Sequence, residues 1–213
     1  NGTYTLTNAS NAVTTLAGNT KTVSLAENSG LAIGTVNTVG LTTSGNITLT
    51  VNGTVTQDQV IAAAGLELLG SNGTYTLTNT SNAITTLAGN TGTVSFLDNS
   101  GFAIGTISGT VGLTTSGSIT LSSTGGISIG ADITSGGSQS YTGPITLTMD
   151  VTLTSSDNDI SFVGTSSVIN STYIASGTPS VTFYNGSGGT YTYNGEVIYA
   201  DSISSSSPTY ALL

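Results

Sequence analysis

The sequence predicts an all-β fold, a parallel β-helix (β-solenoid), and three observations carry that prediction. Residues 72–107 repeat residues 1–36 without a gap and with eight differences, and after one inserted residue the match resumes between residues 39–49 and 111–121. Apolar residues alternate with Thr and Ser in short bursts, and Gly-containing pairs separate the bursts. A long internal repeat of this texture is typical of a stacked array.

The alternating bursts are the predicted strands, because each places two apolar side chains on one strand face and Thr or Ser on the other. Asn-Gly, Ser-Gly, Gly-Asn and Gly-Gly pairs lie between them and tolerate the positive φ of tight turns. Strands this short suit coils of roughly 20 residues in which each strand stacks about 4.8 Å from its counterpart, which gives roughly ten coils. The bursts begin at Tyr4, Val23, Leu31, Ile47, Leu66, Tyr75, Val94, Phe102, Ile119, Ile127, Ile145, Val151, Ile160 and Val181.

A β-sandwich is the structural alternative. We prefer the solenoid because nearly unchanged blocks of about 50 residues fit easily into a stacked array, where equivalent positions have equivalent neighbours. The run from Val60 to Leu69 contains good helix formers, but Gly65 interrupts it and alternation resumes at Leu66, so we predict a strand there. That run is also about half the length needed to cross a bilayer, and we predict no membrane insertion.

The differences between the copies indicate which positions are packed. Several of them change the size of an apolar side chain and keep it apolar, as core sites do. Among these are Val13 and Ile84, Leu25 and Phe96, Leu31 and Phe102, and Val36 and Ile107. Glu27 becomes Asp98, which retains the carboxylate, whereas Lys21, the only basic residue of the chain, becomes Gly92. We therefore expect that the repeat does not depend on a basic side chain.

The chain divides into a duplicated part, residues 1–123, and a divergent part, residues 124–213, whose strands still alternate. The divergent part gathers most of the tyrosines towards its end: Tyr173, Tyr184, Tyr191, Tyr193, Tyr199 and Tyr210. We interpret them as amphipathic rings at the rim of a wider terminal coil. The alternative is an aromatic strip that binds surface glycans through Tyr191 and Tyr193.

Charge excludes two classes of partner. The 213 residues carry one basic and ten acidic side chains, for a net charge of −9. Such a chain has almost nothing with which to neutralise phosphates, so we exclude nucleic acid as a partner. The same charge disfavours an anionic membrane surface. There is no cysteine and hence no disulfide, and we interpret the start at Asn1 as that of a processed product or a piece of a longer chain.

Three stretches carry a resemblance to a known family: GLTTSGNITLT (residues 40–50), VIAAAGLELLGSNGTYTLTNTSNAITTLAGNTGTVSF (60–96) and SQSYTGPITLTMDVTLTSSDNDISFVG (138–164). They resemble the repeats of large bacterial surface adhesins of the filamentous haemagglutinin type, which are exported by two-partner secretion. The resemblance covers residues 1–164. It implies a right-handed parallel β-helix, an extracellular or cell-surface location, and a role in adhesion, biofilm or fibre building. The family's amino-terminal secretion domain is not found in these residues, so the export route is left open.

The carboxylate pair Asp157 and Asp159 is the main candidate for chemistry. Residues two apart share one strand face, as an acid/base pair or a cation site requires. Asp-rich and Asn-rich sequence before a strand is more often a turn whose side chains bond the local backbone, which is our prediction. There is no histidine, which removes Ser-His-Asp triads, most zinc sites and the commonest general base. We predict no enzymatic activity and no cofactor, with a calcium site as the alternative.

The two ends of the chain predict an assembly. The carboxy-terminal Leu212 and Leu213, followed by Asn1-Gly2-Thr3-Tyr4, read like the internal junction at residues 68–75. Neither end carries the charge or proline that protects a strand edge. We predict head-to-tail homopolymers through Tyr4, Leu6, Tyr210, Leu212 and Leu213, since heterologous contacts build filaments. The alternative is that both ends join adjoining segments of a longer polypeptide.

The predicted function is that of an extracellular structural protein, either a β-solenoid subunit of a head-to-tail filament or a stalk segment of a large bacterial adhesin. The alternative is a carbohydrate-binding surface module that uses the carboxy-terminal tyrosines. An ice-binding protein and a polysaccharide-active enzyme are less favoured. The Thr-x-Thr pairs that would suit ice are unevenly spaced, and the β-propensity of Thr explains them.

Overall fold

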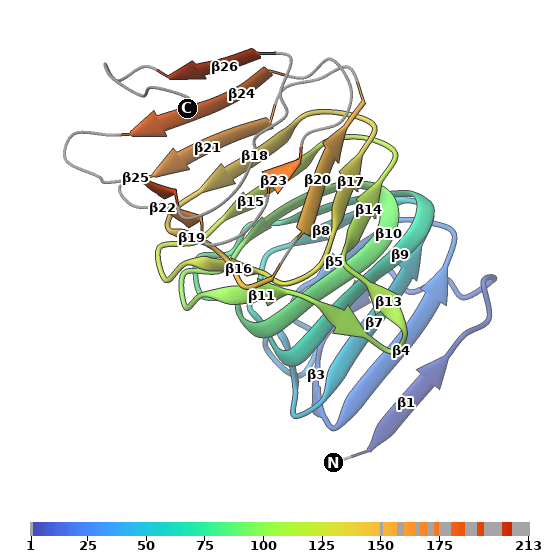
Figure 1. Cartoon of the computed structure of the whole chain (residues 1–213). Helices are drawn as coiled ribbons and strands as arrows, with labels where there is room; N and C mark the ends of the chain where they lie inside the picture. Colours follow the sequence, from blue (N-terminus) through green and yellow to red (C-terminus); the bar gives the residue numbers. More distant parts are fainter. Residues whose placement is uncertain are drawn as a thin grey trace.

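A computed structural model describes residues 2–149, 151–156 and 160–164, together with the backbone of strands at 167–169, 173–174, 180–185, 191–193 and 202–205. In that part of the chain every helical or extended element is a β-strand. Figure 1 shows the strands stacked along one axis, from β1 (Thr3–Leu6) at one end to β26 (Ser202–Ser205) at the other. Successive turns pair in parallel, so the predicted parallel β-solenoid is confirmed. Its handedness and its number of coils stay predictions.

The strands are short and follow one another closely. In the first copy of the repeat they are β1 (Thr3–Leu6), β2 (Thr15–Leu16), β3 (Gly18–Thr20), β4 (Thr22–Glu27), β5 (Leu31–Ile33), β6 (Leu41–Thr43), β7 (Asn46–Val51) and β8 (Thr54–Gln57). Around the second copy they are β9 (Ile61–Leu77), β10 (Ala83–Leu97), β11 (Phe102–Ile104), β12 (Thr106–Ile107), β13 (Thr110–Val111), β14 (Leu113–Thr115) and β15 (Ile119–Ser122). The divergent part contains β16 (Ile127–Ile129), β17 (Ile133–Ser135), β18 (Gln139–Thr142), β19 (Ile145–Leu147), β20 (Val151–Ser155), β21 (Ile160–Gly164), β22 (Ser167–Ile169), β23 (Tyr173–Ile174), β24 (Ser180–Asn185), β25 (Tyr191–Tyr193) and β26.

The core is a set of columns in which apolar side chains of successive turns lie over one another. One column runs through the parallel partners Val23, Ile47, Leu66, Leu87 and Ile104, all of them buried. Burial of each such side chain contributes roughly 1.5–3 kcal/mol. The partners are separated by 24, 19, 21 and 17 residues, so coil length varies from turn to turn.

The four apolar pairs named above occupy core positions in the second copy, as predicted. In the second copy Ile84, Phe96, Phe102 and Ile107 are all between 1% and 4% exposed. The rings of Phe96 and Phe102 pack edge to face with their centroids 5.1 Å apart. The two leucines of the first copy thus changed to phenylalanine at positions that contact each other.

The segment that combined helix formers with alternation is extended. β9 begins at Ile61 and continues to Leu77, so the strand predicted there is confirmed. It pairs with β10 along most of its length, with one irregularity in register between Thr91 and Thr93. The two long strands run side by side around the solenoid, and β9 contains the junction between the copies at residues 71 and 72.

The length of the sequence repeat does not correspond to a whole number of solenoid turns. The column that begins with Tyr4 and Val23 leads on to Leu66 and Leu87. Tyr75, the second-copy equivalent of Tyr4, instead stacks on Val55 of β8. A 71-residue repeat therefore contains three turns and part of a fourth, and the second copy starts on a different side of the solenoid. Equivalent positions keep their contacts within the copy but change column.

Candidate functional site

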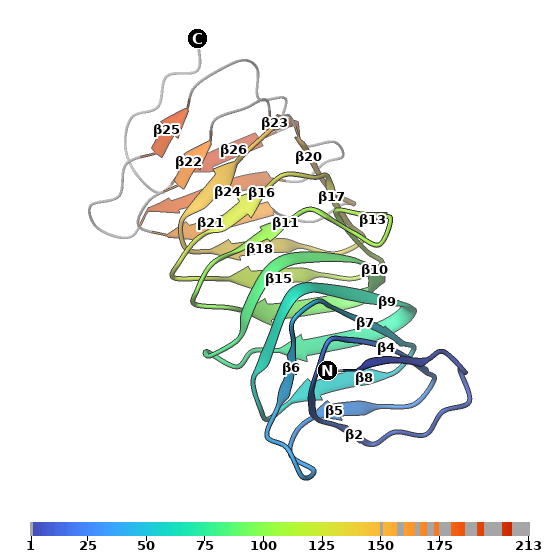
Figure 2. The same ribbon diagram turned by 90° about the horizontal axis from the view of Figure 1, so that it is seen from below.

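The predicted assembly residues Tyr4 and Leu6 lie on β1. This strand follows the amino terminus, which Figure 2 marks near one end of the stack. β1 pairs in parallel with β4 through Tyr4 with Val23 and Leu6 with Leu25, and among the described strands it has no partner on its other side. Tyr4 is 55% exposed and Leu6 is 45% exposed. This end of the solenoid therefore presents apolar side chains beside an unpaired strand edge.

The same end contains an apolar hollow of about 300 Å³. Leu16, Val23 and Leu41 line it together with Tyr4 and Leu6. The predicted partners from the other end of the chain, Tyr210, Leu212 and Leu213, lie outside the described residues. The head-to-tail contact itself stays a prediction.

Tyr75 has the position of Tyr4 in the second copy, yet it is fully buried. Its hydroxyl lies 2.7 Å from the carbonyl oxygen of Leu69 and 2.8 Å from that of Leu49, and it accepts a hydrogen bond from the Val51 N–H at 3.2 Å. Burial raises the pKa of the Tyr75 phenol above its usual range, because the phenolate would lose its hydration. Equivalent tyrosines of the same local sequence thus differ: Tyr4 is exposed at the end of the solenoid, and Tyr75 makes buried hydrogen bonds in its core.

Asn82 is a buried side chain that sequence reasoning did not single out, and it ties two coils together. Its amide nitrogen donates to the Leu97 carbonyl oxygen at 2.9 Å and to Gln57 Oε1 at 3.1 Å. Its amide oxygen accepts from the Ile61 N–H at 2.9 Å and from the Gln57 side-chain amide. The available signal was that both copies have Asn here, as Asn11 and Asn82. Gln57, however, lies outside the duplicated block.

Two buried carboxylates act as acceptors for the backbone. Glu27 accepts a hydrogen bond from the Val13 N–H at 3.0 Å, and its second-copy counterpart Asp98 accepts one from the Ile84 N–H at 2.7 Å. Both residues are at most 1% exposed. In each copy, the retained carboxylate therefore links two stretches of backbone that are 14 residues apart in the chain.

The candidate pair Asp157 and Asp159 falls outside the described residues, so the predicted turn stays a prediction. Within the described residues no three His, Cys, Asp or Glu side chains lie close enough to hold a metal ion. Tyr191 and Tyr193 belong to β25, which pairs in parallel with β22. Their side chains are not among those described, so the glycan site also stays a prediction.

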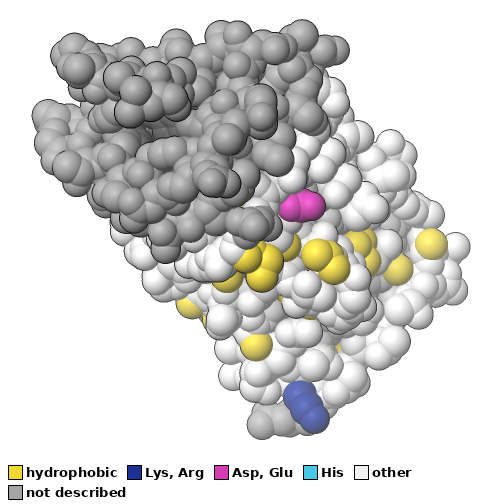
Figure 3. Space-filling view, viewed as in Figure 1, with side chains coloured by type: hydrophobic (Ala, Val, Ile, Leu, Met, Phe, Trp, Pro, Cys, Tyr) yellow, Lys and Arg dark blue, Asp and Glu magenta, His cyan; other side chains and the backbone are white. Residues whose placement is uncertain are grey.

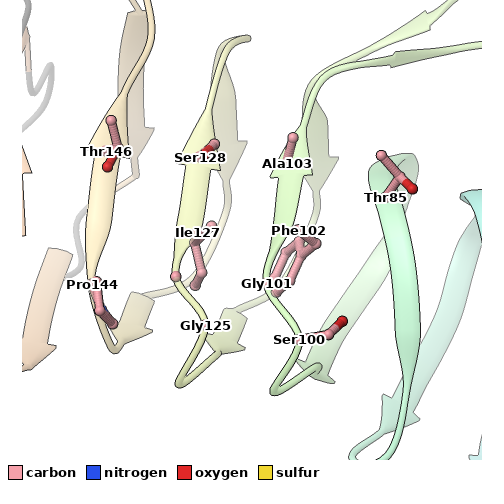
Figure 4. A pocket seen from close by; sticks show the side chains of 11 residues that line it. Thr85, Ser100, Gly101, Phe102, Ala103, Gly125, Ile127, Ser128, Pro144 and Thr146 are labelled. Carbon is pink, nitrogen blue, oxygen red and sulfur yellow. The ribbon is translucent and has the colours of Figure 1, made fainter.

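Sequence reasoning also missed a shallow groove of about 400 Å³ on the side of the solenoid (Figure 4). It crosses successive strands where Ala103, Ser128 and Thr146 are in register, and glycines at 101, 125 and 126 leave room beside them. Its lining residues offer hydroxyl and backbone groups and include no titratable side chain. It can accept or donate hydrogen bonds, but these residues have no group for acid–base work.

Comparisons with protein-family models, with curated proteins and with solved structures gave no match to this chain.

The outward-facing columns differ from one another: Thr114, Thr134 and Thr154 lie in register on successive turns, whereas the column of Thr5 mixes residue types. The column that starts at Thr5 continues through Ser24, Thr48, Glu67 and Ala88, so threonine is not kept from turn to turn. A flat ice-binding surface needs the same hydroxyl in register on each coil, and this column lacks it.

None of the described residues form a helix long and apolar enough to cross a membrane.

Proposed function

We propose that this chain is an extracellular structural protein: a rod-like β-solenoid segment of a bacterial surface adhesin or filament. One observation carries the proposal. A single cluster of buried apolar residues extends from Val23 to Phe162, and the backbone strands continue the stack to β26. A fold of this kind adds length with every coil, because each coil contacts only its neighbours.

The chemistry of the described side chains supports a structural role. Asp98, Glu27 and Glu67, all buried, have backbone N–H or threonine hydroxyl partners. Figure 3 shows a surface on which charged side chains are sparse and other polar side chains and backbone predominate. Hydroxyl and amide groups then provide solubility, and the net charge of −9 adds mutual repulsion between rods.

The rod acts either as a subunit that polymerises head to tail or as a stalk segment within a larger adhesin. The open edge of β1, with Tyr4 and Leu6 exposed, supports both versions, because an unpaired strand edge is a template for a further parallel strand. The repeat resemblance supports the extracellular location.

Electron microscopy and sedimentation of the purified 213-residue chain test the proposal. We expect rigid rods about 40–50 Å long at low concentration, from roughly 4.8 Å per coil. If the chain is a polymer subunit, the rods elongate as concentration rises, and Leu6→Asp abolishes elongation while Val111→Asp, at an exposed site away from β1, does not. If the rods never elongate, the result excludes the polymer subunit and favours the stalk segment. Glycan binding that is lost in Tyr191→Ala or Tyr193→Ala would instead favour the carbohydrate-binding alternative.

A further inference from the structure

The two copies give an internal comparison of the same residues with and without a coil beneath them. Several positions differ in burial, and four pairs illustrate this: Tyr4 is 55% exposed and Tyr75 0%, Leu6 45% and Leu77 0%, Val36 60% and Ile107 4%, while Asn11 is half-buried and Asn82 2% exposed. Val39 is a control, because it is 61% exposed and its counterpart Val111 is 63% exposed. The difference is therefore confined to particular positions and is not a general property of the first copy.

One coil, residues 54–70, lies beneath the strands that begin the second copy. Val55 pairs with Tyr75, Ala63 pairs with Ile84, and the stretch from Gly65 to Gly70 pairs with that from Thr86 to Thr91. The equivalent segments of the first copy, at residues 3–6, 12–13 and 15–20, have no described strand beneath them. A single coil thus accounts for the burial of three successive segments.

Asn11 is already oriented for such a coil. Its amide nitrogen donates to the carbonyl oxygens of Leu6 and Ala26 at 2.9 and 3.1 Å. Asn82 makes the same two contacts within its own copy, to the equivalent residues Leu77 and Leu97. In Asn82 the amide oxygen also accepts from Ile61 and Gln57 of the coil beneath. Among the hydrogen bonds of the described residues, the Asn11 amide oxygen accepts none.

The hairpin of each copy gives a second, independent indication. In the second copy, Ile107 of β12 lies over Gly65 of the coil beneath, with its Cδ1 only 3.0 Å from where a Gly65 Cβ would be. The first copy has its counterpart Val36 next to the antiparallel bridge between Thr35 and Val39, and Val36 is exposed. A glycine in the coil below the first copy would give Val36 the cover that Gly65 gives Ile107.

We infer that the amino-terminal end of this solenoid is a docking site for one further parallel coil. This coil stacks beneath residues 3–20 and has the side-chain pattern of residues 54–70. The coil supplies an amide side chain and a backbone N–H to Asn11, as Gln57 and Ile61 do for Asn82. It supplies leucines to the apolar hollow beside Tyr4, as Leu66 and Leu68 do in the core of the second copy, and a glycine beneath Val36. This inference deepens the proposed structural function, because it specifies the chemistry of the neighbour that the rod accepts at this end.

A graft tests the inference in the full chain. Residues 53–71 are placed directly before Asn1, which reproduces the internal junction of residues 71 and 72. We expect the amides of residues 3–20 to exchange with solvent at least about tenfold more slowly than in the ungrafted chain, because local opening then breaks contacts with the added coil. The melting temperature should rise by roughly 4 °C or more, as stabilisation of a domain of this size by about 2 kcal/mol gives.

The matched control is the same graft with Gln57→Ala and Leu66→Asp in the added coil only. It keeps the length of the graft and removes the amide partner and the apolar filling, so we expect most of the gain to disappear. Equal protection in both grafts, or none in either while the rest of the chain remains folded, overturns the inference. If electron microscopy shows rods but the graft changes neither amide exchange nor the melting temperature, this inference is wrong and the proposed rod function stands.

Discussion

Glu67 of β9 and Thr110 of β13 are 43 residues apart in the chain and are joined by a hydrogen bond of 2.6 Å. Glu67 faces outward but is only 3% exposed, because the hairpin of β12 and β13 covers it. Thr48 donates a second hydrogen bond to the same carboxylate at 2.7 Å. The hairpin is thus fixed to the side of the solenoid by a charge-assisted contact in addition to the packing of Ile107 over Gly65.

Thr110→Val tests this contact. Removing the hydroxyl leaves a buried carboxylate oxygen without its partner, and we expect a loss of about 1.5–3 kcal/mol in the free energy of unfolding, as for hydrogen bonds to charged groups. Urea unfolding followed by circular dichroism measures it. The control is Thr38→Val, since Thr38 is the exposed first-copy equivalent of Thr110 and should change stability by less than about 0.5 kcal/mol. Equal effects of the two variants would contradict the assignment.

Tyr75→Phe and Tyr4→Phe remove the same hydroxyl from the two copies. At Tyr75 the change leaves the Leu69 and Leu49 carbonyl oxygens and the Val51 N–H short of a partner in a buried site, and we expect a loss of about 1–3 kcal/mol. At Tyr4 the ring is exposed, and we expect less than about 0.5 kcal/mol. Chemical denaturation of both variants under one set of conditions gives the comparison. A Tyr4→Phe cost as large as that of Tyr75→Phe would show that the hydrogen bonds of Tyr75 do not matter.

The raised pKa of Tyr75 predicts a dependence of stability on alkaline pH. A tyrosine of the unfolded chain ionises near pH 10, whereas buried Tyr75 keeps its proton to higher pH. Above about pH 10 the unfolded state therefore binds fewer protons than the folded state, and the free energy of unfolding falls as pH rises towards the folded pKa. We expect the advantage of the natural chain over Tyr75→Phe to be complete below pH 10 and to shrink above it. A constant difference between pH 8 and pH 11 would contradict this.

Gly18 and Gly89 occupy equivalent positions in the two copies, and we expect them to differ in how well they tolerate substitution by alanine. A Cβ at Gly89 would lie 2.6 Å from the Leu68 carbonyl oxygen of the coil beneath, whereas a Cβ at Gly18 meets nothing closer than Leu41 Cδ1 at 4.0 Å. We expect Gly89→Ala to lower the melting temperature by roughly 4 °C or more, since the backbone of the coil must shift, and Gly18→Ala to leave it unchanged or slightly raised. Thermal unfolding of the two variants provides the measurement, and a harmless Gly89→Ala would contradict the close approach.

The sequence allowed the fold class and much of the core to be predicted, because alternation within a strand is a local signal. Phe96 and Phe102 were recognised as packed from the comparison of copies alone. The contacts between coils were beyond such reasoning, since coil lengths vary and the partner of Asn82, Gln57, lies 25 residues away outside the duplicated block. For the same reason, identical local sequences gave no indication that Tyr4 would be exposed and Tyr75 buried.

The edge-to-face pair of Phe96 and Phe102 predicts that the two leucine-to-phenylalanine differences between the copies depend on each other. Phe96→Leu and Phe102→Leu each remove volume from a buried site and the contact of the rings at 5.1 Å, so we expect each to cost about 1–2 kcal/mol. The double variant restores the leucine pair of the first copy, Leu25 and Leu31, which is also buried. We expect its cost to fall short of the sum by about 0.5–1.5 kcal/mol, the energy of an aromatic pair beyond its area. A double-mutant cycle by urea unfolding measures this coupling, and strict additivity would mean that the two rings pack independently.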